Sequence, residues 1–588
     1  MIENIEYLYY YLMQSPEQHP TETKETINTN KEIERKYALG TLPPNLESFP
    51  QQPIQQGYAF LANDGTEVRV RHDGEKFLLT GKVGQGKERV EVEREITADQ
   101  FASLWQTTRE RRIEKTRYAI PLKDGGTAEL DLYHGQLEGF VTTEVEFASN
   151  EEADRFVAPD WFGQEVTDNG AYHNQRLAVS GRPDQARDTP ESGTHPTNPE
   201  YDIDQGLIVA RMLIDLKRAM VDRPVIVALA GGSASGKTSA VGQRLVDAYG
   251  EQAGMLSLDN YYRGGTFMAE QKARGHELTF DQPEAVDLLL VAQHLGQLRD
   301  KHAIEEPIYS FANGGTRTGT KPFEPRPVIV AEGLFTLDTQ LSHVSDVKIY
   351  VDIGTHGQFL RRIMRDVNRT DWPPQQIIDY FSTVVVPMHE KYVATTKTNA
   401  DIVIRNEYRP IEEADRAGMY EQQLKFPTAL THEQLRKLGA EKLSQSHQID
   451  HYLNPRDRQL TDSDEILRIR EEGETKTLGY KGPKKTGLPY RKRPKFEFEI
   501  DDQIYNHFLT AYGQEFITID KERTMYRYNN VLLSIDSVKK TDAQGEHDVG
   551  SWTEIRFPNE ILPEEVDTTI RALGLDPASA RLESYLEI

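Results

Sequence analysis

The chain contains 588 residues, carries a formal net charge of −25 at pH 7 and has no cysteine. This length exceeds what one hydrophobic core organises, the acidic balance disfavours a general nucleic-acid-binding surface, and the missing cysteines exclude disulfides, thiolate metal sites and cysteine nucleophiles. No apolar run approaches membrane-spanning length, and the N-terminus lacks the basic start and apolar core of a signal peptide. We therefore expect a cytoplasmic protein of several folding units, with neither a nucleic acid nor a membrane as partner.

Residues 1–30 are predicted to form an N-terminal tail of unassigned role, and residues 31–180 a first folding unit. This unit alternates apolar and charged residues in short segments such as Val68–Arg71, Val90–Glu93 and Glu144–Phe147, separated by Gly-rich turns. A period of two residues is typical of strands. We expect an antiparallel all-β unit.

The strands of this first unit place charged residues at every second position, where side chains share one face. On Lys31–Lys36, interpreted as one strand, Glu32, Glu34 and Lys36 point the same way. The other pairs are Arg69 with Arg71, Glu91 with Glu93, Lys115 with Arg117, Glu129 with Asp131, and Glu144 with Glu146. One explanation is cross-strand salt bridging on an open, solvated sheet. The favoured explanation is a closed barrel whose basic rows bind a chain of phosphates and whose acidic rows hold Mg²⁺ or Mn²⁺.

This pattern resembles the CYTH superfamily, the triphosphate tunnel metalloenzymes. The motifs that carry the resemblance are Glu32-x-Glu34-x-Lys36, Val68–Arg71, Thr80–Lys82, Glu91–Glu93, Lys115–Tyr118, Glu129–Asp131 and Glu144–Glu146. The resemblance implies metal-dependent hydrolysis of tripolyphosphate or a nucleoside triphosphate in an N-terminal β-tunnel. The phosphate-binding residues implied are Lys36, which also receives a catalytic role, Arg69, Arg71, Lys82, Lys115 and Arg117. The metal ligands implied are Glu32, Glu34, Glu91, Glu93, Glu129, Asp131, Glu144 and Glu146.

Residues 181–200 are rich in Pro, Thr, Ser and Asp and are predicted to be a flexible linker. From 201 to 410, continuous apolar strands such as Val225–Ala230 and Val328–Ala331 alternate with longer amphipathic stretches. This pattern indicates an α/β domain with a parallel sheet. The first of these strands leads into Gly231–Thr238, which fits the P-loop pattern G-x-x-x-x-G-K-[ST], and a helical pattern follows.

The residues of this loop predicted to bind the phosphates of ATP are Gly231, Gly232, Ser233, Ala234, Ser235, Gly236, Lys237 and Thr238. Glycines let backbone N–H groups curl around phosphate oxygens, Lys237 reaches the β and γ oxygens, and the Thr238 hydroxyl coordinates Mg²⁺. The strand–loop–helix context favours this interpretation over a glycine-rich turn without a ligand.

The central region resembles the uridine kinase and phosphoribulokinase-like family. The segments that carry the resemblance are Ser257–Tyr262, Phe280–Asp287, Pro307–Tyr309, Glu332–Gly333 and Arg361–Asp366. The resemblance implies the following residues: Asp259 as catalytic base, Lys237 as a further catalytic group, Asp281 and Tyr309 at the acceptor, Glu332 near magnesium, and lid arginines Arg361, Arg362, Arg365 and Arg369. The arginines alternatively form a solvated helix face.

The acceptor segment departs from the family pattern in one respect. Family members that phosphorylate uridine or cytidine carry a His shortly after the Tyr of Pro-x-Tyr, whereas Tyr309 is followed by Ser310–Arg317 without a His. The resemblance therefore implies a nucleoside-like hydroxyl acceptor without identifying it.

Residues 419–588 return to the alternating pattern and resemble a second, degenerate CYTH-like tunnel. Glu421, Gln423 and Lys425 repeat the spacing of the first unit, but Gln423 replaces a carboxylate, and Arg556 stands where another Glu is expected. A neutral amide is a poorer magnesium ligand, so we predict weak binding of a phosphorylated ligand or regulation of the kinase. The basic run from Lys481 to Lys495 is alternatively a nucleic-acid patch, although the acidic strands beside it favour a tunnel wall.

The predicted fold class is multidomain α+β and α/β. The favoured function is a bifunctional enzyme, a triphosphatase joined to a P-loop kinase with ATP as donor and Mg²⁺ or Mn²⁺ as cofactor, acting on nucleoside triphosphates and inorganic polyphosphates. The alternatives are an adenylate cyclase, an activity that occurs on the CYTH fold, and a nucleotide or polyphosphate sensor with little turnover. The acceptor, the tunnel's substrate preference and the oligomeric state, including a homo-oligomer, stay open.

Overall fold

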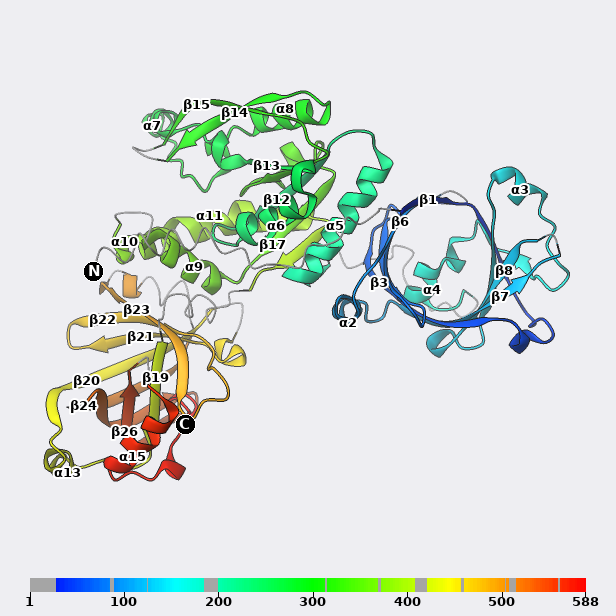
Figure 1. The fold of residues 1–588 in the computed structure, drawn as a ribbon. Coiled ribbons are helices and arrows are strands. Elements are labelled where there is room, and N and C mark those ends of the chain that lie inside the picture. The colour runs from blue at the N-terminus through cyan, green and yellow to red at the C-terminus, as the bar shows by residue number, and fades with distance from the viewer. Residues whose placement is uncertain are drawn as a thin grey trace.

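The computed structural model describes residues 28–84, 89–123, 125–183, 199–311, 315–367, 372–407, 420–455, 459–502, 504–506, 514–558 and 561–588. These residues form a curled β-sheet (the N-terminal sheet), an α/β domain (the central domain) and a β-barrel (the C-terminal barrel), as Figure 1 shows. Nearly all of the predicted tail, most of the predicted linker and Arg369 lie outside the described residues.

The N-terminal sheet is antiparallel and ten-stranded, in the order β1-β6-β5-β4-β3-β7-β8-β9-β2-β10. Its strands are β1 (Asn28–Glu32), β2 (Glu34–Ala38), β3 (Gln51–Leu61), β4 (Glu67–His72), β5 (Phe77–Val83), β6 (Arg89–Glu95), β7 (Arg112–Pro121), β8 (Thr127–Tyr133), β9 (Val141–Glu146) and β10 (Gln164–Glu165). Helices α2 (Ala98–Thr107), α3 (Asn150–Arg155) and α4 (Asn174–Ser180) accompany it. Along β4, Val68 and Val70 are fully buried in an apolar core, which leaves the intervening arginines on the opposite face.

Two predictions are wrong for this sheet. Lys31–Lys36 is not one strand, and the described part of the sheet does not close into a tunnel. Ile33 separates β1, which pairs with β6, from β2, which pairs with β9. Strands β1 and β2 are adjacent along the chain but lie at or near opposite edges of the sheet, so the sheet curls back on itself. Among the described residues, no hydrogen-bond ladder joins the two edge strands, β1 and β10. Glu32 consequently lies on a different strand from Glu34 and Lys36.

The central domain contains a parallel six-stranded sheet in the order β11-β18-β17-β12-β16-β13. Its strands are β11 (Glu200–Asp202), β12 (Val225–Gly231), β13 (Ala253–Ser257), β16 (Val328–Glu332), β17 (Val347–Asp352) and β18 (Ile402–Arg405). Helices α5 (Ile203–Met220) and α6 (Gln243–Tyr249) cover one face and α8 (Leu288–Arg299) covers the other. A hairpin of β14 (Ile304–Ser310) and β15 (Thr316–Phe323), and helix α7 (Gly265–Ala273), complete this part. The predicted parallel α/β sheet is confirmed.

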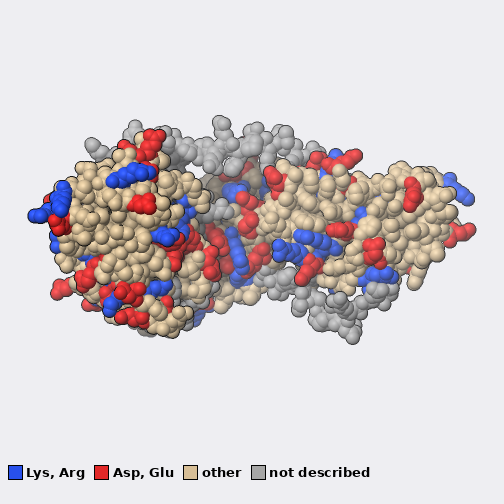
Figure 2. All heavy atoms as spheres, turned by 90° about the horizontal axis from the view of Figure 1, so that it is seen from below, with Lys and Arg blue, Asp and Glu red and all other residues tan. Residues whose placement is uncertain are grey.

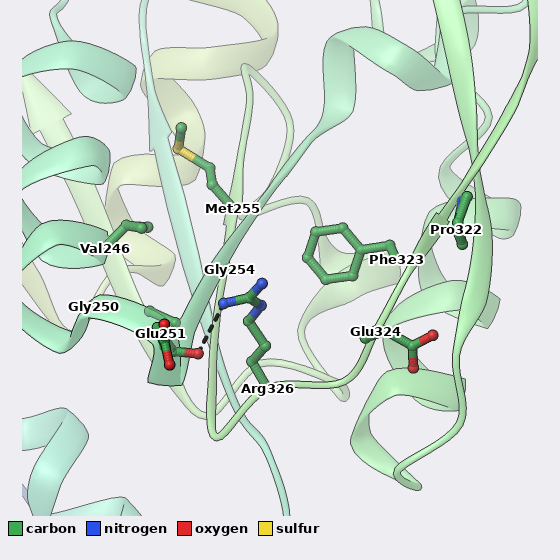
Figure 3. A pocket seen from close by; sticks show the side chains of 10 residues that line it. Val246, Gly250, Glu251, Gly254, Met255, Pro322, Phe323, Glu324 and Arg326 are labelled. Atoms are coloured by element: carbon green, nitrogen blue, oxygen red, sulfur yellow. Dashed lines mark hydrogen bonds between the residues drawn. The ribbon is translucent and has the colours of Figure 1, made fainter.

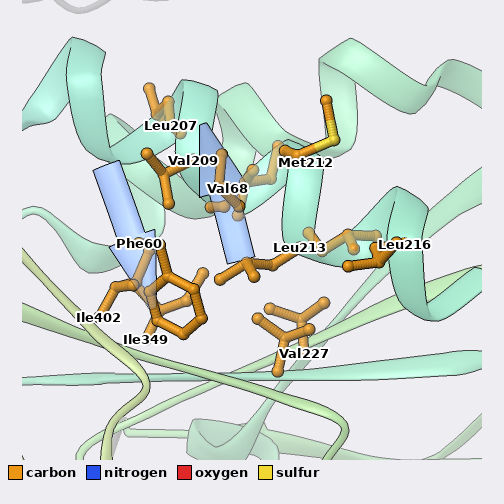
Figure 4. Packing of buried hydrophobic residues seen from close by; sticks show 14 of the residues in the cluster. Phe60, Val68, Leu207, Val209, Met212, Leu213, Leu216, Val227, Ile349 and Ile402 are labelled. Carbon is orange, nitrogen blue, oxygen red and sulfur yellow. The ribbon is translucent and has the colours of Figure 1, made fainter. Parts of the chain in front are cut away.

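Helix α5 joins the N-terminal sheet to the central sheet through one continuous core (Figure 4). Phe60 and Val68 come from the N-terminal sheet, Met212 from α5, and Val227 and Ile349 from the central sheet. All of them are buried. The two units are therefore not linked only by a tether but share apolar surface.

A glycine and a buried ion pair tighten this junction. A Cβ atom at Gly81 would lie 2.8 Å from the sulfur of Met212, so the missing side chain lets α5 approach β5. Arg94 on β6 pairs with Asp215 on α5, and the Tyr249 hydroxyl donates to the same carboxylate at 2.9 Å. Because Asp215 is only 3% exposed, removing Arg94 would leave this buried charge to the more distant Arg218, at 3.6 Å.

The C-terminal barrel is closed, in the order β19-β23-β22-β21-β20-β24-β25-β26. Its strands are β19 (Tyr420–Phe426), β20 (Glu441–Asn454), β21 (Ile466–Glu472), β22 (Thr475–Lys481), β23 (Arg491–Ile500), β24 (Gln514–Tyr528), β25 (Val531–Asp542) and β26 (Gly545–Phe557). Helices α13 (His432–Lys437) and α15 (Pro563–Ala572) pack on its outside through apolar side chains. The predicted second β-tunnel is thus confirmed as a closed antiparallel barrel.

Two helices of the central domain pack on the outer face of this barrel. Helices α9 (Thr355–Val367) and α10 (Pro374–Tyr380) contribute Phe359 and Ile378 to a buried cluster with Ile469 and Leu478 of strands β21 and β22. Figure 1 shows these helices above strands β21 to β23. The alternation of the strands places apolar side chains outward here and charged side chains inward.

In the part of the chain that the structure describes, no helix is both long and apolar enough to cross a membrane. On the face drawn in Figure 2, acidic and basic side chains are interspersed along the described surface.

Candidate functional site

The predicted P-loop connects β12 to a helix, as its motif requires. Gly231, Ala234 and Gly236 have φ angles of 156°, 63° and 82°, which curl the loop tightly. A Cβ atom at Gly231 would lie 2.5 Å from the carbonyl oxygen of Val351, so glycine is sterically required there. The chain then enters a π-helical turn, Lys237–Gly242, that continues into α6.

Hard oxygen atoms meet beside this loop. The Thr238 hydroxyl donates to one carboxylate oxygen of Glu332 at 2.9 Å, and the Ser257 hydroxyl donates to the other at 2.5 Å. Glu332 ends strand β16 and is 4% exposed. Hydroxyl and carboxylate oxygens are the ligands that Mg²⁺ prefers, so these residues fit the predicted magnesium site.

Two aspartates close to the loop have raised pKa values. Surrounding protein atoms desolvate the Asp259 carboxylate and raise its pKa, although the side chain remains accessible to solvent; Lys237 opposes this shift. Burial likewise raises the pKa of Asp281 against the opposing charge of Arg362. A carboxylate with a raised pKa is a better proton acceptor than an ordinary one, which suits the predicted role of Asp259.

Arg361 and Arg362 on α9 reach the P-loop. A terminal nitrogen of Arg361 donates to the Ser235 carbonyl oxygen at 3.3 Å, and one of Arg362 donates to the Ser233 hydroxyl at 3.0 Å. Arg365 instead pairs with a neighbouring carboxylate on its own helix at 2.7 Å. The first two arginines are therefore not a solvated helix face, because both side chains turn toward the predicted phosphate loop.

Tyr309 lies in an aromatic cluster that the sequence analysis did not foresee. Its ring centroid is 4.9 Å from that of Phe311 and 5.6 Å from that of Tyr262, and Phe280 lies 6.1 Å from Phe311. Phe311 is 56% exposed, so a flat apolar face stays open to solvent beside Asp281. The signal in the sequence was the aromatic residue two positions after Tyr309.

The structure also brings three polar residues to the P-loop that carried no motif. The Asn406 side chain donates to the Ser235 carbonyl oxygen at 2.7 Å and fixes the back of the loop. Gln358 and His389 lie against Gly232, where a Cβ atom would be 2.3 Å and 2.9 Å from them. The Gln358 amide nitrogen and His389 Nδ1 are buried without a hydrogen-bond partner among the described residues, so they are available to a bound nucleotide.

In the N-terminal sheet, the predicted charged residues gather on one enclosed face. The ion pairs are Lys36–Glu144 at 2.8 Å, Lys82–Glu91 at 3.0 Å, Arg69–Glu91 at 3.8 Å, Arg71–Glu93 at 3.2 Å, Lys115–Asp131 at 2.5 Å, Arg117–Asp131 at 2.7 Å, Arg117–Glu144 at 3.0 Å and Arg117–Glu129. Most of these side chains are buried. These side chains therefore do not lie on an open, solvated face, as one explanation in the sequence analysis assumed. The cross-strand salt bridges that the same explanation predicted are present.

Carboxylates of this face lie opposite each other at two places; at one of them, Glu129 and Glu144 of the β8–β9 ladder, Arg117 contacts both. Glu34 lies directly opposite Glu146 in the β2–β9 ladder, and two like charges in that position repel unless a cation compensates them. Among the described residues, no group of three or more His, Asp or Glu side chains is close enough to hold a metal ion. The side chain of Glu32 is not described, so its predicted role as a metal ligand stays a prediction.

In the C-terminal barrel, the same face carries more cations than carboxylates. The cations are Lys425, Arg468, Arg470, Lys481, Arg491, Lys495, Lys521, Arg523 and Arg556, and the carboxylates are Glu421, Asp450, Glu497, Asp536 and Glu554. Burial, reinforced by Arg491, lowers the pKa of Lys425 to about 8. The barrel therefore has an interior of positive balance despite the acidic whole chain.

The basic run from Lys481 to Lys495 does not form one exposed patch. Arg491 and Arg493 are 3% and 1% exposed, and Lys481 pairs with the buried Glu421 at 2.6 Å. The interpretation of this run as a tunnel wall is supported by these contacts.

Comparison with known proteins assigns two parts of the chain. The phosphoribulokinase/uridine kinase family model matches residues 226–409, and the CYTH domain model matches residues 419–571. A uridine kinase from Macrococcus caseolyticus is 36% identical over 185 residues, which are 31% of this chain and 89% of the relative. An inorganic triphosphatase from Nitrosomonas europaea is 42% identical over 149 residues, which are 25% of this chain and 97% of the relative. The chain belongs to the phosphoribulokinase/uridine kinase and CYTH families.

Two solved structures are similar to parts of this chain. A crystal structure of an inorganic triphosphatase is 41% identical, with 25% of this chain and 95% of that chain covered at a TM-score of 0.22. A structure of D-glycerate 3-kinase from Cryptococcus neoformans is 15% identical, with 32% of this chain and 87% of that chain covered at a TM-score of 0.27.

The family assignment corrects the predicted position of the CYTH domain. The sequence analysis placed the triphosphatase in residues 31–180, whereas the CYTH model matches residues 419–571, in the C-terminal barrel, and neither family model begins before residue 226. The comparisons thus support the C-terminal region as the triphosphatase-like part. Alternating charged strands occur in both regions, so this pattern alone did not distinguish them.

A surface pocket in the kinase-family domain lies away from its P-loop. It has a volume of about 530 Å³ and is lined by Val246, Gly250, Glu251, Ala253, Gly254, Met255, Pro322, Phe323, Glu324 and Arg326 (Figure 3). Ala253 and Gly254 begin strand β13, whereas the P-loop follows the carboxyl end of β12. Ligands of parallel α/β sheets bind at the carboxyl ends of the strands, so we assign no role in the chemistry to this pocket.

Proposed function

We propose that the central domain transfers the γ-phosphoryl group of ATP to a hydroxyl group of a small acceptor that carries a flat ring. The observation that carries this proposal is the convergence of the P-loop, the Thr238–Glu332 oxygen pair and the raised-pKa carboxylate of Asp259. The family relation supports it, since the matched relative is a uridine kinase.

In this proposal each group has one task. Thr238 and Glu332 would hold Mg²⁺, which neutralises charge on the phosphates when it is bound. Asp259 accepts the proton of the attacking hydroxyl, because its raised pKa makes it a competent base. Arg361 and Arg362 stabilise the charge of the transferring group from the lid helix α9.

The aromatic cluster supports a ring-bearing acceptor. Tyr262, Tyr309 and Phe311 present aromatic faces beside Asp281, and flat rings stack on such faces. Asp281 accepts hydrogen bonds from acceptor hydroxyls in this arrangement. A sugar joined to a base or another ring meets both requirements.

The N-terminal sheet would bind phosphate chains. On the N-terminal sheet, we propose that Lys36, Arg69, Arg71, Lys82, Lys115 and Arg117 contact phosphates and that Glu34 and Glu146 hold a divalent cation. The supporting observation is that their faces converge across neighbouring strands.

The test of the kinase proposal is incubation of the full chain with ATP, Mg²⁺ and a panel of nucleosides and sugars, with chromatographic separation of products. We expect one phosphorylated acceptor, and we expect Asp259→Asn to lower kcat by about 100-fold or more while ATP binding is retained. The exposed Asp300 provides the matched control Asp300→Asn, which should leave kcat unchanged. Phosphoryl transfer that is retained in Asp259→Asn would show that Asp259 is not the catalytic base. ATP binding without transfer to any acceptor would refute the activity.

A further inference from the structure

The C-terminal barrel repeats the register of the N-terminal sheet with one pair of residues exchanged. In the N-terminal sheet, Glu34 lies opposite Glu146 across β2 and β9. In the barrel, Gln423 lies opposite Arg556 across β19 and β26, and the Lys–Glu pair two residues away is the same in both units. A pair suited to a divalent cation has thus become an amide and a fixed positive charge.

The remaining carboxylates of the barrel are already compensated by protein cations. Glu421 is 2.6 Å from Lys481 and 3.3 Å from Lys495, and these charges hold its pKa well below the usual range against its burial. Glu554 is contacted by Arg556 at 2.9 Å and by Lys425 at 3.2 Å. The divalent-metal site that the CYTH relation implies therefore does not fit these residues.

Asp450 shows the same arrangement on the other side of the barrel. Arg470 and Lys521 each lie 2.6 Å from it, and Arg468 lies at 3.1 Å. Arg468 also pairs with Glu497 at 2.7 Å, so three cations share two carboxylates and leave a local positive excess. An anion in the interior would complete the balance.

One buried cation has donors that point to no protein acceptor. Arg491 is 3% exposed and lies opposite Gln423 in the β19–β23 ladder. Among the described residues, its Nε and one terminal nitrogen have no hydrogen-bond partner, and its nearest carboxylate, on Glu421, is 3.7 Å away. Unpaired buried donors are costly, and a phosphate oxygen is the kind of acceptor that a guanidinium binds best.

We infer that the C-terminal barrel is a binding site for a linear oligophosphate, of the tripolyphosphate class, that needs no divalent cation. The Arg556 guanidinium supplies the positive charge that a metal ion would otherwise provide. Arg491 supplies N–H donors that have no protein acceptor among the described residues. This site goes beyond the proposed phosphotransferase and does not depend on it, because binding requires neither ATP nor an acceptor.

The test is calorimetric titration of the full chain with tripolyphosphate in excess EDTA. We expect binding that survives EDTA and weakens at least 10-fold in Arg491→Gln and in Arg556→Gln. Arg491→Gln should fold, since its Nε and one terminal nitrogen make no hydrogen bond, and the partly exposed Arg556 gives a second variant if it does not. Arg571→Gln, on the outer helix α15 and with a side chain 69% exposed, is the matched control and should bind as the parent does.

A double variant tests the exchange of metal for guanidinium directly. Gln423→Glu with Arg556→Glu restores the facing carboxylates, so tripolyphosphate binding should fall at least 10-fold in EDTA and recover when Mn²⁺ is added. The inference is overturned if EDTA abolishes binding to the parent chain, if neither Arg491→Gln nor Arg556→Gln weakens it, or if the double variant binds equally well without metal. None of these results bears on transfer from ATP, which is measured separately.

Discussion

At the scale of single residues, the proposed role of Asp259 as base predicts a pH dependence for the central site. Its pKa lies above the ordinary value of 3.8 because surrounding protein atoms desolvate the carboxylate. A base must be deprotonated to act, so kcat/KM should be lost as the pH falls through this raised pKa, and the acid limb should lie above the range of an ordinary Asp. A pH–rate profile checks this. A profile that is flat down to pH 4, or an unchanged acid limb in Asp259→Asn, would contradict the role.

A matched pair of glutamates tests whether either flanking unit hydrolyses phosphate chains. Because Glu421 is held by lysines and faces no second carboxylate, Glu421→Gln should leave phosphate release from tripolyphosphate with Mg²⁺ unchanged. Glu34→Gln reports on the facing carboxylates of the N-terminal sheet in the same assay. Loss of release in Glu421→Gln alone would show that the barrel is a metal-dependent hydrolase and would contradict our interpretation of its interior.

Much of the residue pattern was predictable, and the reasons for the gaps are physical. The period of two correctly put Lys36, Glu144 and Arg117 on one face, because side chains of a strand alternate. It did not give the cross-strand partners, since register depends on tertiary pairing. Gln358 and Asn406 were missed because neither belongs to a motif and both reach the P-loop from positions distant in sequence.

At the scale of elements, helix α9, the proposed lid, shares a core with the barrel, so we expect barrel packing to affect the position of α9. Ile469 is fully buried in this cluster with Phe359 of α9. Ile469→Ala should destabilise the chain by about 2–5 kcal/mol through the cavity it leaves. It should also raise the KM for ATP, because α9 carries the arginines that contact the P-loop.

Thermal unfolding and steady-state kinetics measure the two effects. Leu289→Ala is the control. Because Leu289 is 71% exposed, its replacement should change neither the stability of the chain nor the KM for ATP. A large loss of stability with an unchanged KM for ATP would show that the packing does not position the lid.

The elements themselves were foreseen where the pattern was local. Strands β12, β16 and β17 followed from apolar runs typical of parallel sheets. The break at Ile33 was not foreseen, because the alternation continues through it and only the pairing of β1 with β6 reveals two strands. The packing of α9 on the barrel was not predicted either, because an apolar helix face does not show which element it packs against.

At the scale of the whole molecule, α5 ties the N-terminal sheet to the kinase-family domain through one core. A ligand that binds only the folded state stabilises it by about 2.7 kcal/mol at 100 times its Kd. Saturating ATP should therefore raise the melting temperature of the N-terminal sheet as well as that of the central domain.

Tryptophan fluorescence can isolate this effect. In a Trp372→Phe, Trp552→Phe variant, the remaining tryptophans are Trp105 and Trp161, both in the N-terminal unit. Their melting transition should shift upward with ATP, and the shift should disappear in Lys237→Ala. A melting transition whose temperature does not change with ATP would show that the two units unfold independently.

The central claim is phosphoryl transfer at the P-loop, and ³¹P NMR of the reaction of the full chain with ATP, Mg²⁺ and a ring-bearing hydroxyl acceptor tests it most directly. We predict a new phosphomonoester signal that requires the acceptor and is lost in Asp259→Asn. Release of inorganic phosphate alone, with no phosphorylated acceptor across the panel, would contradict the claim.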